Sequence, residues 1–380
     1  MSGSFCIKNE EEKKLSIQNT HIEVNLKNLE HNLNFLRKKI SEKTKILCVV
    51  KAFGYGSEPV EIAKKLEENK VDYLAVAYSN EGFELRKSGI TSPILVLHPQ
   101  RDDFDDIIKY KLEPNIYSFR VLDAFIGRSK NEKEYPFHLK FNTGLNRLGF
   151  SFKDIEEIHT KVTSSSNIKI KYIFSHLGAS EDLNEKKFTD NQIELFEKIS
   201  SKMSTIFQSE FKKHLLNTSG ILNYNKFQYD MVRSGIGLYG YGNDHKYDKF
   251  FKPVVNLKSV VSQIHEIKKG DSVGYNRGFI ATKDSKVGII PIGHADGISR
   301  SFGNGKASFI INNQEAKIVG NVCMDMLMVD LSKINCNEGD EVIIIDSNNQ
   351  NADQLARKNG TISYEVLTSL SNRIKRIYIK

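Results

Sequence analysis

The lysine at position 51 is the first residue whose surroundings suggest chemistry. It follows an apolar run, Ile46 to Val50, and precedes Tyr55, which stands between two glycines in KAFGYG. A charged side chain where an apolar run stops is either a solvated strand end or a reactive amine at the rim of the core. A lysine of the second kind can act as a nucleophile. Both interpretations of Lys51 are open at this level.

Residues suited to anion binding follow several other apolar runs. The loop NTGLNRLG carries Arg147 after one run, and the run KYIFSH ends in His176. Alone, Arg147 could cap a turn and His176 could be a core histidine. Together with residues after two further runs they predict a site for a phosphorylated cofactor or substrate, because glycine lets backbone N–H groups approach an anion closely. These further residues are Thr218, Ser219 and Gly220, and then Arg233, Ser234, Gly235 and Ile236.

The runs that carry these residues alternate with amphipathic segments. The segment DNQIELFEKISSKMSTIFQ, for example, has apolar residues every three or four positions, as on one face of a helix. Eight strands alternating with helices over about 225 residues predict a (β/α)8 barrel. A doubly wound open sheet is the alternative architecture. The predicted strands are 45–50, 72–77, 93–98, 113–117, 137–141, 171–176, 215–219 and 230–234.

The composition of the sequence changes after Gly242. A polar segment ends in Pro253, and beyond it come runs rich in β-branched residues with frequent glycine and asparagine, such as KVGIIPIG, ASFIINN and EVIIID. These runs predict a second, mostly antiparallel β domain. The expected divisions are an N-terminal extension at 1–19 that could be disordered, the barrel at 20–245 and the β domain at 250–380.

The composition is that of a globular protein in a reducing compartment. The formal net charge of +8 comes from 55 basic residues interleaved with 47 acidic ones, so a solvated surface or an anionic ligand explains it without nucleic acid. No apolar stretch reaches the roughly 18 residues of a membrane span. The charged N-terminus lacks the pattern of an export signal. Four scattered cysteines favour the cytoplasm.

Three other patterns carry weaker signals. GIGLYG, residues 235–240, matches a dinucleotide fingerprint, but it opens no helix and Val260 stands where an acidic residue is required. The histidines show no close metal-ligand spacing, so no catalytic metal is predicted. In the second domain, Tyr275 and the polar insertion at Asp325 are either turn and packing features or site residues. Cys323 has no identifiable base beside it.

Taken together, the motifs resemble one family, the alanine racemases, which are pyridoxal-phosphate enzymes built on a barrel and a β domain. The resemblance runs from about residue 20 to residue 378. One such motif would be weak evidence, whereas eight in the family's order and spacing are strong. The segments are VVKAFGYG, KFNTGLNRLGF, FSHLGASED, VRSGIGLYG, VGYNRGF, IPIGHADG, GNVCMDMLMVDLS and YEVLTSLSNRIKR.

The resemblance implies how the cofactor is held. Lys51 is similar to the lysine that forms a Schiff base with pyridoxal 5'-phosphate, and Arg233 to the arginine that meets the pyridine nitrogen, with His176 near it. A guanidinium cannot give that nitrogen a proton, so the ring is a weaker electron sink, which favours racemisation over transamination. The residues similar to the phosphate contacts are Tyr55, Thr218, Gly235, Ile236 and Tyr364, with Ser219 beside Thr218.

Racemisation needs an acid/base group on each face of the reacting carbon, because a single base returns the proton to the side it left. The resemblance assigns the α-proton of D-alanine to Lys51 and that of L-alanine to Tyr275. Both groups need pKa values well below about 10, and a nearby cation such as Arg233 would lower both. The implied activity is the interconversion of L- and D-alanine, which supplies D-alanine for peptidoglycan precursors.

The resemblance also implies the substrate contacts and the assembly. Arg147 and the backbone N–H of Met324 are similar to the contacts of the substrate carboxylate. Lys140 matches a position that is carbamylated in some members. Tyr275 and Met324 would come from the partner subunit, which implies an obligate head-to-tail homodimer with two composite sites.

The chain departs from the family at a few positions near the expected site. A broader amino-acid racemase stays open as an alternative, because residues at the entrance help to set the size of the substrate side chain. A non-catalytic pyridoxal-phosphate carrier would lack the β domain and Tyr275, and a decarboxylase relative would need a cysteine motif that is not found. The departures are His294 for a common tyrosine at the channel mouth, Asn142 for aspartate, Leu145-Asn146 for Met-Gly, and Phe53 for asparagine.

Overall fold

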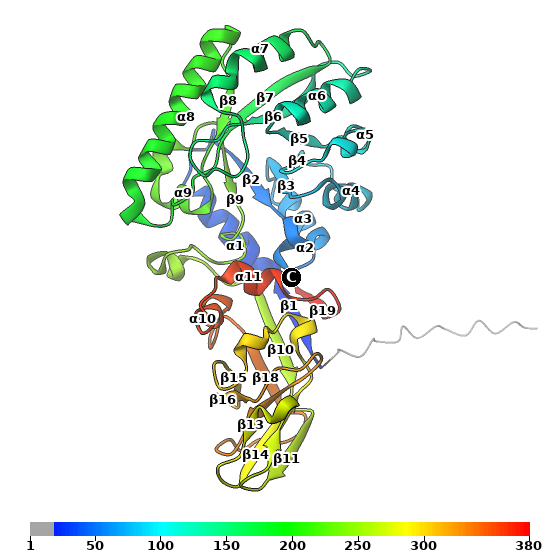
Figure 1. Cartoon of the computed structure of the whole chain (residues 1–380), viewed down its shortest axis with the longest axis vertical. Coiled ribbons are helices and arrows are strands. Elements are labelled where there is room, and N and C mark those ends of the chain that lie inside the picture. The colour runs from blue at the N-terminus through cyan, green and yellow to red at the C-terminus, as the bar shows by residue number, and fades with distance from the viewer. Residues whose placement is uncertain (1–18) are drawn as a thin grey trace, which may run out of the picture.

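The computed structural model describes residues 19–380, which form two bodies joined end to end (Figure 1). A barrel surrounded by helices forms one body, and a curled sheet forms the other. Helices α10 (Ala352–Arg357) and α11 (Ser363–Thr368) lie between them. Residues 1–18 of the predicted N-terminal extension lie outside the described residues.

Within residues 19–380, eight parallel strands close into a barrel, since β2 pairs with both β3 and β9. Leu47 of β2 lies opposite Tyr73 on one side and Arg233 on the other. This closure confirms the predicted barrel and excludes the open sheet. The strands are β2 (Lys45–Val49), β3 (Tyr73–Val76), β4 (Ile94–Val96), β5 (Glu113–Ile116), β6 (Tyr135–Lys140), β7 (Ile168–Phe174), β8 (Lys212–His214) and β9 (Met231–Ser234).

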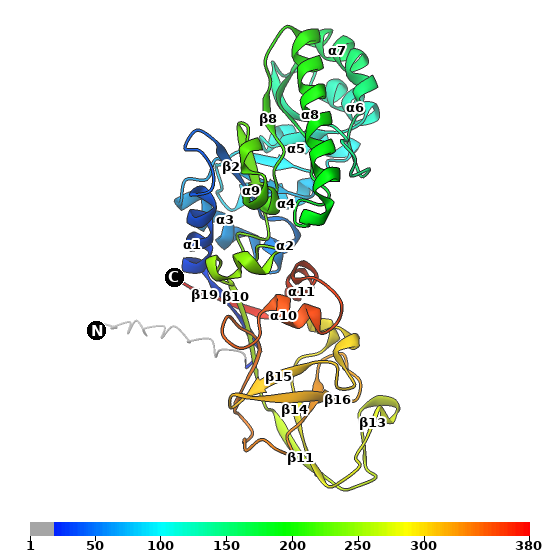
Figure 2. The ribbon, with the colours of Figure 1, turned by 90° about the vertical axis from the view of Figure 1, so that its left-hand side faces the viewer.

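Helices cover the outside of the barrel (Figure 2). Helix α8 (Lys186–Phe207) buries Ile193, Phe196 and Met203 of the predicted apolar stripe, and each buried side chain stabilises the packing by roughly 2 kcal/mol. No helix in the described part of the chain combines the length and apolar character that a membrane crossing needs. The other barrel helices are α1 (Leu26–Arg37), α2 (Lys51–Tyr55), α3 (Pro59–Glu68), α4 (Ser79–Lys87), α5 (Phe104–Lys109), α6 (Phe119–Arg128), α7 (Ile155–Thr163) and α9 (Thr218–Asn223).

One barrel strand lies earlier in the chain than predicted. The expected strand 215–219 is replaced by β8 at Lys212–His214, and Thr218 already begins α9. Asn217 explains the difference, because its side-chain oxygen caps α9 by accepting a hydrogen bond from the Gly220 N–H at 2.8 Å. Thr218 and Ser219 therefore lie in the first turn of a helix, still at the C-terminal end of the barrel.

The second body is a nine-stranded sheet in the order β11-β14-β17-β16-β15-β18-β10-β1-β19, counted over residues 19–380. Its pairings are antiparallel except for β1 with β19, as expected for a mostly antiparallel domain. A hairpin of β12 and β13 extends from it. The strands are β1 (His21–Asn25), β10 (Val255–Val260), β11 (Gln263–Ile267), β12 (Ser272–Val273), β13 (Phe279–Ile280), β14 (Ser285–Ile290), β15 (Ser308–Ile311), β16 (Gln314–Val319), β17 (Leu327–Asp330), β18 (Glu341–Ile345) and β19 (Lys375–Ile379).

Strand β1 connects the two bodies. It falls in the segment 20–245 expected for the barrel, yet it pairs with β10 and β19 of the second sheet. Its alternating pattern HIEVN buries Ile22 and Val24, as a strand with one face on a core requires. The domain bounds at 245 and 250 stay a prediction. The structure adds that β1, although it precedes the barrel in the sequence, is a strand of the second sheet.

Candidate active site

A cavity of about 690 Å³ lies at the C-terminal ends of the barrel strands. Barrels of this kind carry their sites at this face, because the loops after the strands converge there. The cavity brings together most of the residues that were predicted from the sequence. They are Lys51, Tyr55, Lys140, Arg147, His176, Thr218, Arg233, Gly235, Ile236 and Tyr364.

Lys51 stands at the cavity wall on an uncommon turn. It is the first residue of α2, and residues 52–56 all have positive φ, from 52° to 78°. A left-handed conformation costs a non-glycine residue roughly 1–2 kcal/mol, so the surrounding structure must hold this turn. Gly56 is one fixed point, since a Cβ there would lie 2.0 Å from the carbonyl oxygen of Leu367.

Glu81 of α4 holds the start of this turn beside the amine. One of its carboxylate oxygens accepts from the Ala52 N–H and the other from the Ala77 N–H, each at 2.7 Å. Burial lowers the pKa of Lys51, the charge of Arg147 lowers it further, and Glu81 acts in the opposite direction. The lowered pKa increases the fraction of neutral amine, which is the nucleophilic form.

Lys140 ends β6 and is only 6% exposed. Burial lowers its pKa to about 7, and the charges of Arg233, Arg147 and Lys51 act in the same direction. Its Nζ lies 4.7 Å from the centre of the Phe174 ring. Four basic side chains thus border one cavity, and their positive potential attracts anionic ligands.

Arg233 of β9 is 4% exposed, and its guanidinium is held on several sides. It donates to the carbonyl oxygens of Ser175 and Leu215 at 2.8 and 2.9 Å. It also contacts Nδ1 of His214 at 2.7 Å and Nδ1 of His176 at 3.3 Å. Burial, followed by the charge of Arg233, holds the pKa of His176 well below its ordinary value, so the ring is neutral and accepts this bond.

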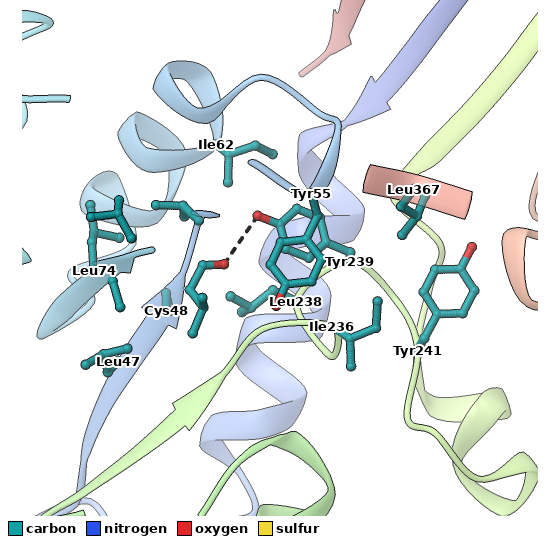
Figure 3. Packing of buried hydrophobic residues seen from close by; sticks show 14 of the residues in the cluster. Leu47, Cys48, Tyr55, Ile62, Leu74, Ile236, Leu238, Tyr239, Tyr241 and Leu367 are labelled. Carbon is teal, nitrogen blue, oxygen red and sulfur yellow. Dashed lines mark hydrogen bonds between the residues drawn. The ribbon is translucent and has the colours of Figure 1, made fainter. Parts of the chain in front are cut away.

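Tyr55 lies against the glycines that follow β9. Its ring stacks on Tyr239 with centroids 4.4 Å apart (Figure 3). A Cβ on Gly235 would lie 2.2 Å from the Tyr55 hydroxyl oxygen, and one on Gly237 would lie 2.7 Å from a Thr218 methyl carbon. Only glycine permits these approaches. The hydroxyls and the backbone here form a small polar pocket suited to phosphate oxygens.

The C-terminal part of the chain contributes Tyr364, which lies in the first turn of α11. Its hydroxyl accepts from the side-chain amide of Asn243 at 3.0 Å, and the same amide donates to Ser219 at 3.1 Å. Ser219 itself is buried and does not line the cavity. Asn243, which was not predicted as a site residue, therefore links Ser219 to Tyr364.

Arg147 reaches the cavity from a turn held by two asparagines. The side-chain oxygen of Asn142 accepts from the N–H groups of Gly144 and Asn146 at 3.1 and 3.0 Å. Asn146 has a φ of 55°, and asparagine tolerates this left-handed region better than most residues. Asn146 can therefore stand where the resemblance leads one to expect glycine, without altering the path of the chain to Arg147.

Tyr275 and Met324 lie in the second body, away from this cavity. Tyr275 begins a short 3-10 turn (Tyr275–Arg277) before β13, which lies toward the far end of the sheet from the barrel (Figures 1 and 2). Tyr275 is 74% exposed and Met324 is 59% exposed. Neither lines the cavity that contains Lys51. The two predicted acid/base groups are thus not brought together within one chain.

The loop of Met324 is tied to the C-terminal segment by Arg373. The guanidinium donates to Asp296 at 2.6 Å and to Asp325 at 2.8 Å. The exposed His294 lies beside the same loop, since its N–H donates to the Cys323 carbonyl at 2.9 Å. The polar insertion at Asp325 thus anchors the loop, through a partner that the sequence did not single out.

The structure adds further residues to the cavity wall. Tyr78 and His98 follow β3 and β4, and Asn115 lies in β5, where its amide donates to the Leu97 carbonyl at 2.7 Å. Asn217, which caps α9, also lines the cavity. Most of these lie at or just after a strand end, which is the same signal that marked Lys51, so a search of every strand end would have found them.

Comparisons with known proteins agree over almost the whole chain. The family "Alanine racemase, N-terminal domain" matches residues 24–243, and "Alanine racemase, C-terminal domain" matches residues 254–378. An alanine racemase of Clostridium kluyveri is 36% identical over 370 residues, which cover 94% of this chain and 93% of that protein.

Solved structures give the same result. An alanine racemase of Clostridium difficile 630 has a TM-score of 0.89 and 34% identity over 95% of this chain and 96% of its own. An alanine racemase of Bartonella henselae, described as having covalently bound pyridoxal phosphate, has a TM-score of 0.86 and 28% identity over 95% of this chain and 99% of its own. The eight barrel strands, nearly all of the sheet domain and the site segments fall within the matched regions, and the chain belongs to the alanine racemase family.

Proposed function

We propose that this chain interconverts L-alanine and D-alanine with bound pyridoxal 5'-phosphate. The observation that carries the proposal is Lys51, a half-buried amine at the cavity wall whose lowered pKa and cationic surroundings suit it to attack on a carbonyl carbon. Alanine is the substrate named for the related proteins.

The residues around the cavity fit this cofactor. Lys51 would bind it covalently, as described for the Bartonella henselae protein, and Arg233 would donate to the pyridine nitrogen, with His176 beside it. When bound, pyridoxal phosphate withdraws electrons from the α-carbon of an amino acid. Five residues around the glycine-lined pocket would hold the phosphate, and Ser219 would support them through Asn243. The five are Tyr55, Thr218, Gly235, Ile236 and Tyr364.

Two side chains would move the α-proton. Nζ of Lys51 serves one face in its neutral form, which burial and the charge of Arg147 favour. The other face needs a second group, and we assign it to Oη of Tyr275 from a second copy of the chain. This assignment rests on the exposure of Tyr275 and on its absence from the cavity of its own chain. Arg233 brings positive charge without a proton that it can transfer.

Arg147 and Met324 would hold the substrate carboxylate. Arg147 lines the cavity and can form charge-assisted hydrogen bonds to a carboxylate. The backbone N–H of Met324 lies on the loop anchored by Arg373, which keeps that donor in place. This contact, like that of Tyr275, would come from the second copy.

A head-to-tail homodimer follows from the incomplete site of the single chain. Two copies, each laying its second body over the barrel of the other, would form two composite sites. Exposed apolar side chains accompany Tyr275 and Met324 on this body, including Ile280 and Met326, which are 50% and 46% exposed. Clustered exposed apolar groups of this kind are typical of protein interfaces.

Lys140 would be carbamylated. A buried amine with a pKa of about 7 is substantially neutral at physiological pH, and its nitrogen can add CO₂. The N–C bond forms, one proton leaves the nitrogen, and a carboxylate anion results. That anion would lie among Arg147, Arg233 and Lys51 and would offset their mutual repulsion.

D-alanine supply for peptidoglycan precursors in the cytoplasm is the physiological role that we propose. Cys48, Cys323 and Cys336 are free in the described part of the chain, which fits a reducing compartment. A broader amino-acid racemase is the second candidate, because the exposed His294 lies beside the loop of Met324.

The test is incubation of the purified protein, pyridoxal phosphate and single L-amino acids, followed by chiral chromatography. L-Alanine should approach equal amounts of both enantiomers, and larger substrates should react more slowly. Comparable rates for serine or longer side chains would favour the broader racemase. Carbon dioxide or a keto acid as the main product would contradict a racemase.

A further inference from the structure

A line of buried polar side chains runs through the barrel interior, and the proposed reaction does not use most of it. Nδ1 of His214 lies 2.7 Å from the guanidinium of Arg233, and Nε2 of His214 lies 3.0 Å from Nδ1 of His138. Nε2 of His138 then lies 3.0 Å from a carboxylate oxygen of Glu113. Glu113 begins β5, at the end of the barrel opposite to the cavity.

Glu113 sets the direction of the bond to His138. The carboxylate accepts from Lys171 Nζ at 2.6 Å and from the Tyr73 hydroxyl at 3.3 Å. Burial raises the pKa of Glu113, but the hydrogen bond from His138 and the salt bridge with Lys171 together lower it below its ordinary value, so the carboxylate is ionised and only accepts. Nε2 of His138 must therefore carry the hydrogen.

The hydrogen bonds between His138 and the cavity must follow the same donor-to-acceptor direction. A neutral imidazole has one N–H, so a hydrogen on Nε2 of His138 leaves Nδ1 as an acceptor. Nε2 of His214 must then donate to it, which leaves Nδ1 of His214 as an acceptor for Arg233. A guanidinium can only donate, so the two ends of the line agree without an unsatisfied atom. Burial lowers the pKa values of both histidines, which keeps each ring neutral.

We propose that Glu113 and His138 are positioning residues for Arg233. Through the fixed hydrogen-bond direction they keep Nδ1 of His214 as an acceptor, which holds the guanidinium at the cavity wall. The inference rests on the proposed function only in that Arg233 faces the cofactor ring. The chain thus places a determinant of its cofactor site at the opposite end of the barrel.

Packing alone would not require the hydrogen to be on Nε2 of His138 and His214. The His138 ring stacks on Tyr172 with centroids 4.8 Å apart, and the His214 ring stacks on Phe174 at 4.4 Å. Stacking is indifferent to which nitrogen carries the hydrogen. The tautomers of His138 and His214 therefore distinguish the two roles, because only a positioning role requires the hydrogen on Nε2 of both rings.

The first test uses the full-length, cofactor-free protein labelled with ¹⁵N at histidine. At about pH 8, NMR should show both His138 and His214 with the hydrogen on Nε2 and with Nδ1 unprotonated. A cationic ring, or a hydrogen on Nδ1 of either residue, would overturn the proposal. This outcome is independent of whether pyridoxal phosphate is the cofactor.

The second test compares Glu113→Gln with Glu156→Gln. A glutamine at 113 lacks the charge and one of the two acceptor oxygens on which Lys171, His138 and Tyr73 converge, so the N–H of His138 Nε2 loses its ionised acceptor. We expect the affinity for pyridoxal phosphate to fall about tenfold and the absorbance maximum of the bound cofactor to shift. Glu156 forms a surface ion pair with Lys202 at 2.8 Å, so its variant should change neither. Unchanged tautomers, affinity and absorbance in Glu113→Gln would refute the proposal, and the NMR test on the unaltered protein remains decisive if this variant fails to fold.

Discussion

The ends of the two bodies present reactive side chains in opposite ways. Lys51 lies at the wall of a cationic cavity, and its turn is fixed by Glu81 and by the close approach of Gly56 to Leu367. Tyr275 also starts a turn with left-handed residues, since Asn276 has a φ of 57°, but its side chain is 74% exposed.

The contrast shows which of the predicted site residues a single chain brings together. The barrel end already has its cations, hydroxyls and glycines around one cavity. The Tyr275 turn is held through its backbone, because Asn321 donates to the Tyr275 carbonyl at 3.0 Å. The phenol, in contrast, lies outside the cavity that contains Lys51 of the same chain. A fixed backbone beneath an exposed side chain is what a group that acts on a neighbouring molecule requires.

The largest expected effect is that of Lys51→Ala, which removes the amine from the barrel cavity. Alanine racemisation should fall by about 10⁴-fold or more, because both covalent attachment and one proton transfer are lost. Borohydride treatment followed by intact-mass measurement should show the added cofactor mass only in the unaltered protein. The matched control is Lys64→Ala on α3, whose amine is paired with Glu61 at the surface, and it should behave like the unaltered protein. Cofactor mass still attached to Lys51→Ala would show that the amine of Lys51 is not the site of covalent attachment and would contradict the proposed mechanism.

The next effect distinguishes an active site shared by two chains from an active site within one chain. Tyr275→Phe should lose about 10³-fold in activity, as a phenol is removed from the exposed turn. Mixing it with Lys51→Ala under conditions of subunit exchange gives half mixed dimers, each with one intact composite site. About a quarter of the unaltered activity should therefore return.

The outcome of mixing is read from chiral product formation and from the mass of the assembly by light scattering. If the mixture stays as inactive as its components while exchange is demonstrated, Tyr275 does not act on the Lys51 of a partner. A monomer at working concentrations would have the same consequence.

The contrast between the two bodies also explains what could be predicted from the sequence. Strand ends are local features, so Lys51, Arg233 and Gly235 were identified from runs of apolar residues and the residues after them. The barrel followed from repetition of the same local pattern. These predictions needed no knowledge of pairing between distant segments.

Pairing between distant segments accounts for what was not predicted. Strand β1 pairs with β10 and β19, which lie more than 200 residues away in the sequence, and the alternation HIEVN does not reveal its partner. The line from Glu113 to Arg233 depends on the strand register that places His138 opposite Asn115 and Tyr172. The left-handed run at 52–56 contains only two glycines, so its composition gave little indication of its conformation.

A third effect probes the electrostatics of the barrel cavity with two variants that remove charges of opposite sign. Arg147 lowers the pKa of Lys51 and Glu81 raises it. In the proposed function only neutral Lys51 would react with the cofactor aldehyde, so loading of cofactor-free protein should speed up as pH rises through this pKa. Arg147→Gln should move the midpoint of the loading rate to higher pH and Glu81→Gln to lower pH, each by about half a unit.

Loading is followed by the absorbance of the attached cofactor at several pH values. The free cofactor titrates identically in the experiments on the unaltered protein and on both variants. The shift in the pKa of Lys51 is therefore read from the differences between them. Shifts of the same sign in both variants would show that the amine is governed by something other than these two charges.

A smaller effect concerns Lys140. Its folded-state pKa of about 7 lies below that of an unfolded lysine, so the unfolded state binds more protons between these values and stability rises with pH across that window. Lys140→Met should therefore stabilise the cofactor-free protein by a few kcal/mol at about pH 7 in CO₂-free buffer, and the gain should shrink toward pH 10. Bicarbonate should stabilise only the unaltered protein, because it alone can form the carbamate. Denaturant unfolding measures both, and a pH-independent difference would contradict the buried, neutral amine.

The smallest effect lies in the turn that delivers Arg147. Asn146 has a φ of 55°, and its backbone N–H and side chain both bond to Asn142. Asn146→Ala loses the side-chain bond and places a less tolerant residue in the left-handed region, which should cost about 1 kcal/mol and raise the KM for alanine more than it lowers kcat. Asn146→Gly loses the same bond but relieves the backbone, so it should lie between alanine and the unaltered chain in both stability and KM. If alanine were as good as asparagine at this position, the backbone conformation of the turn would not be what holds Arg147 at the cavity, and the cationic end would owe its arrangement to Asn142 alone.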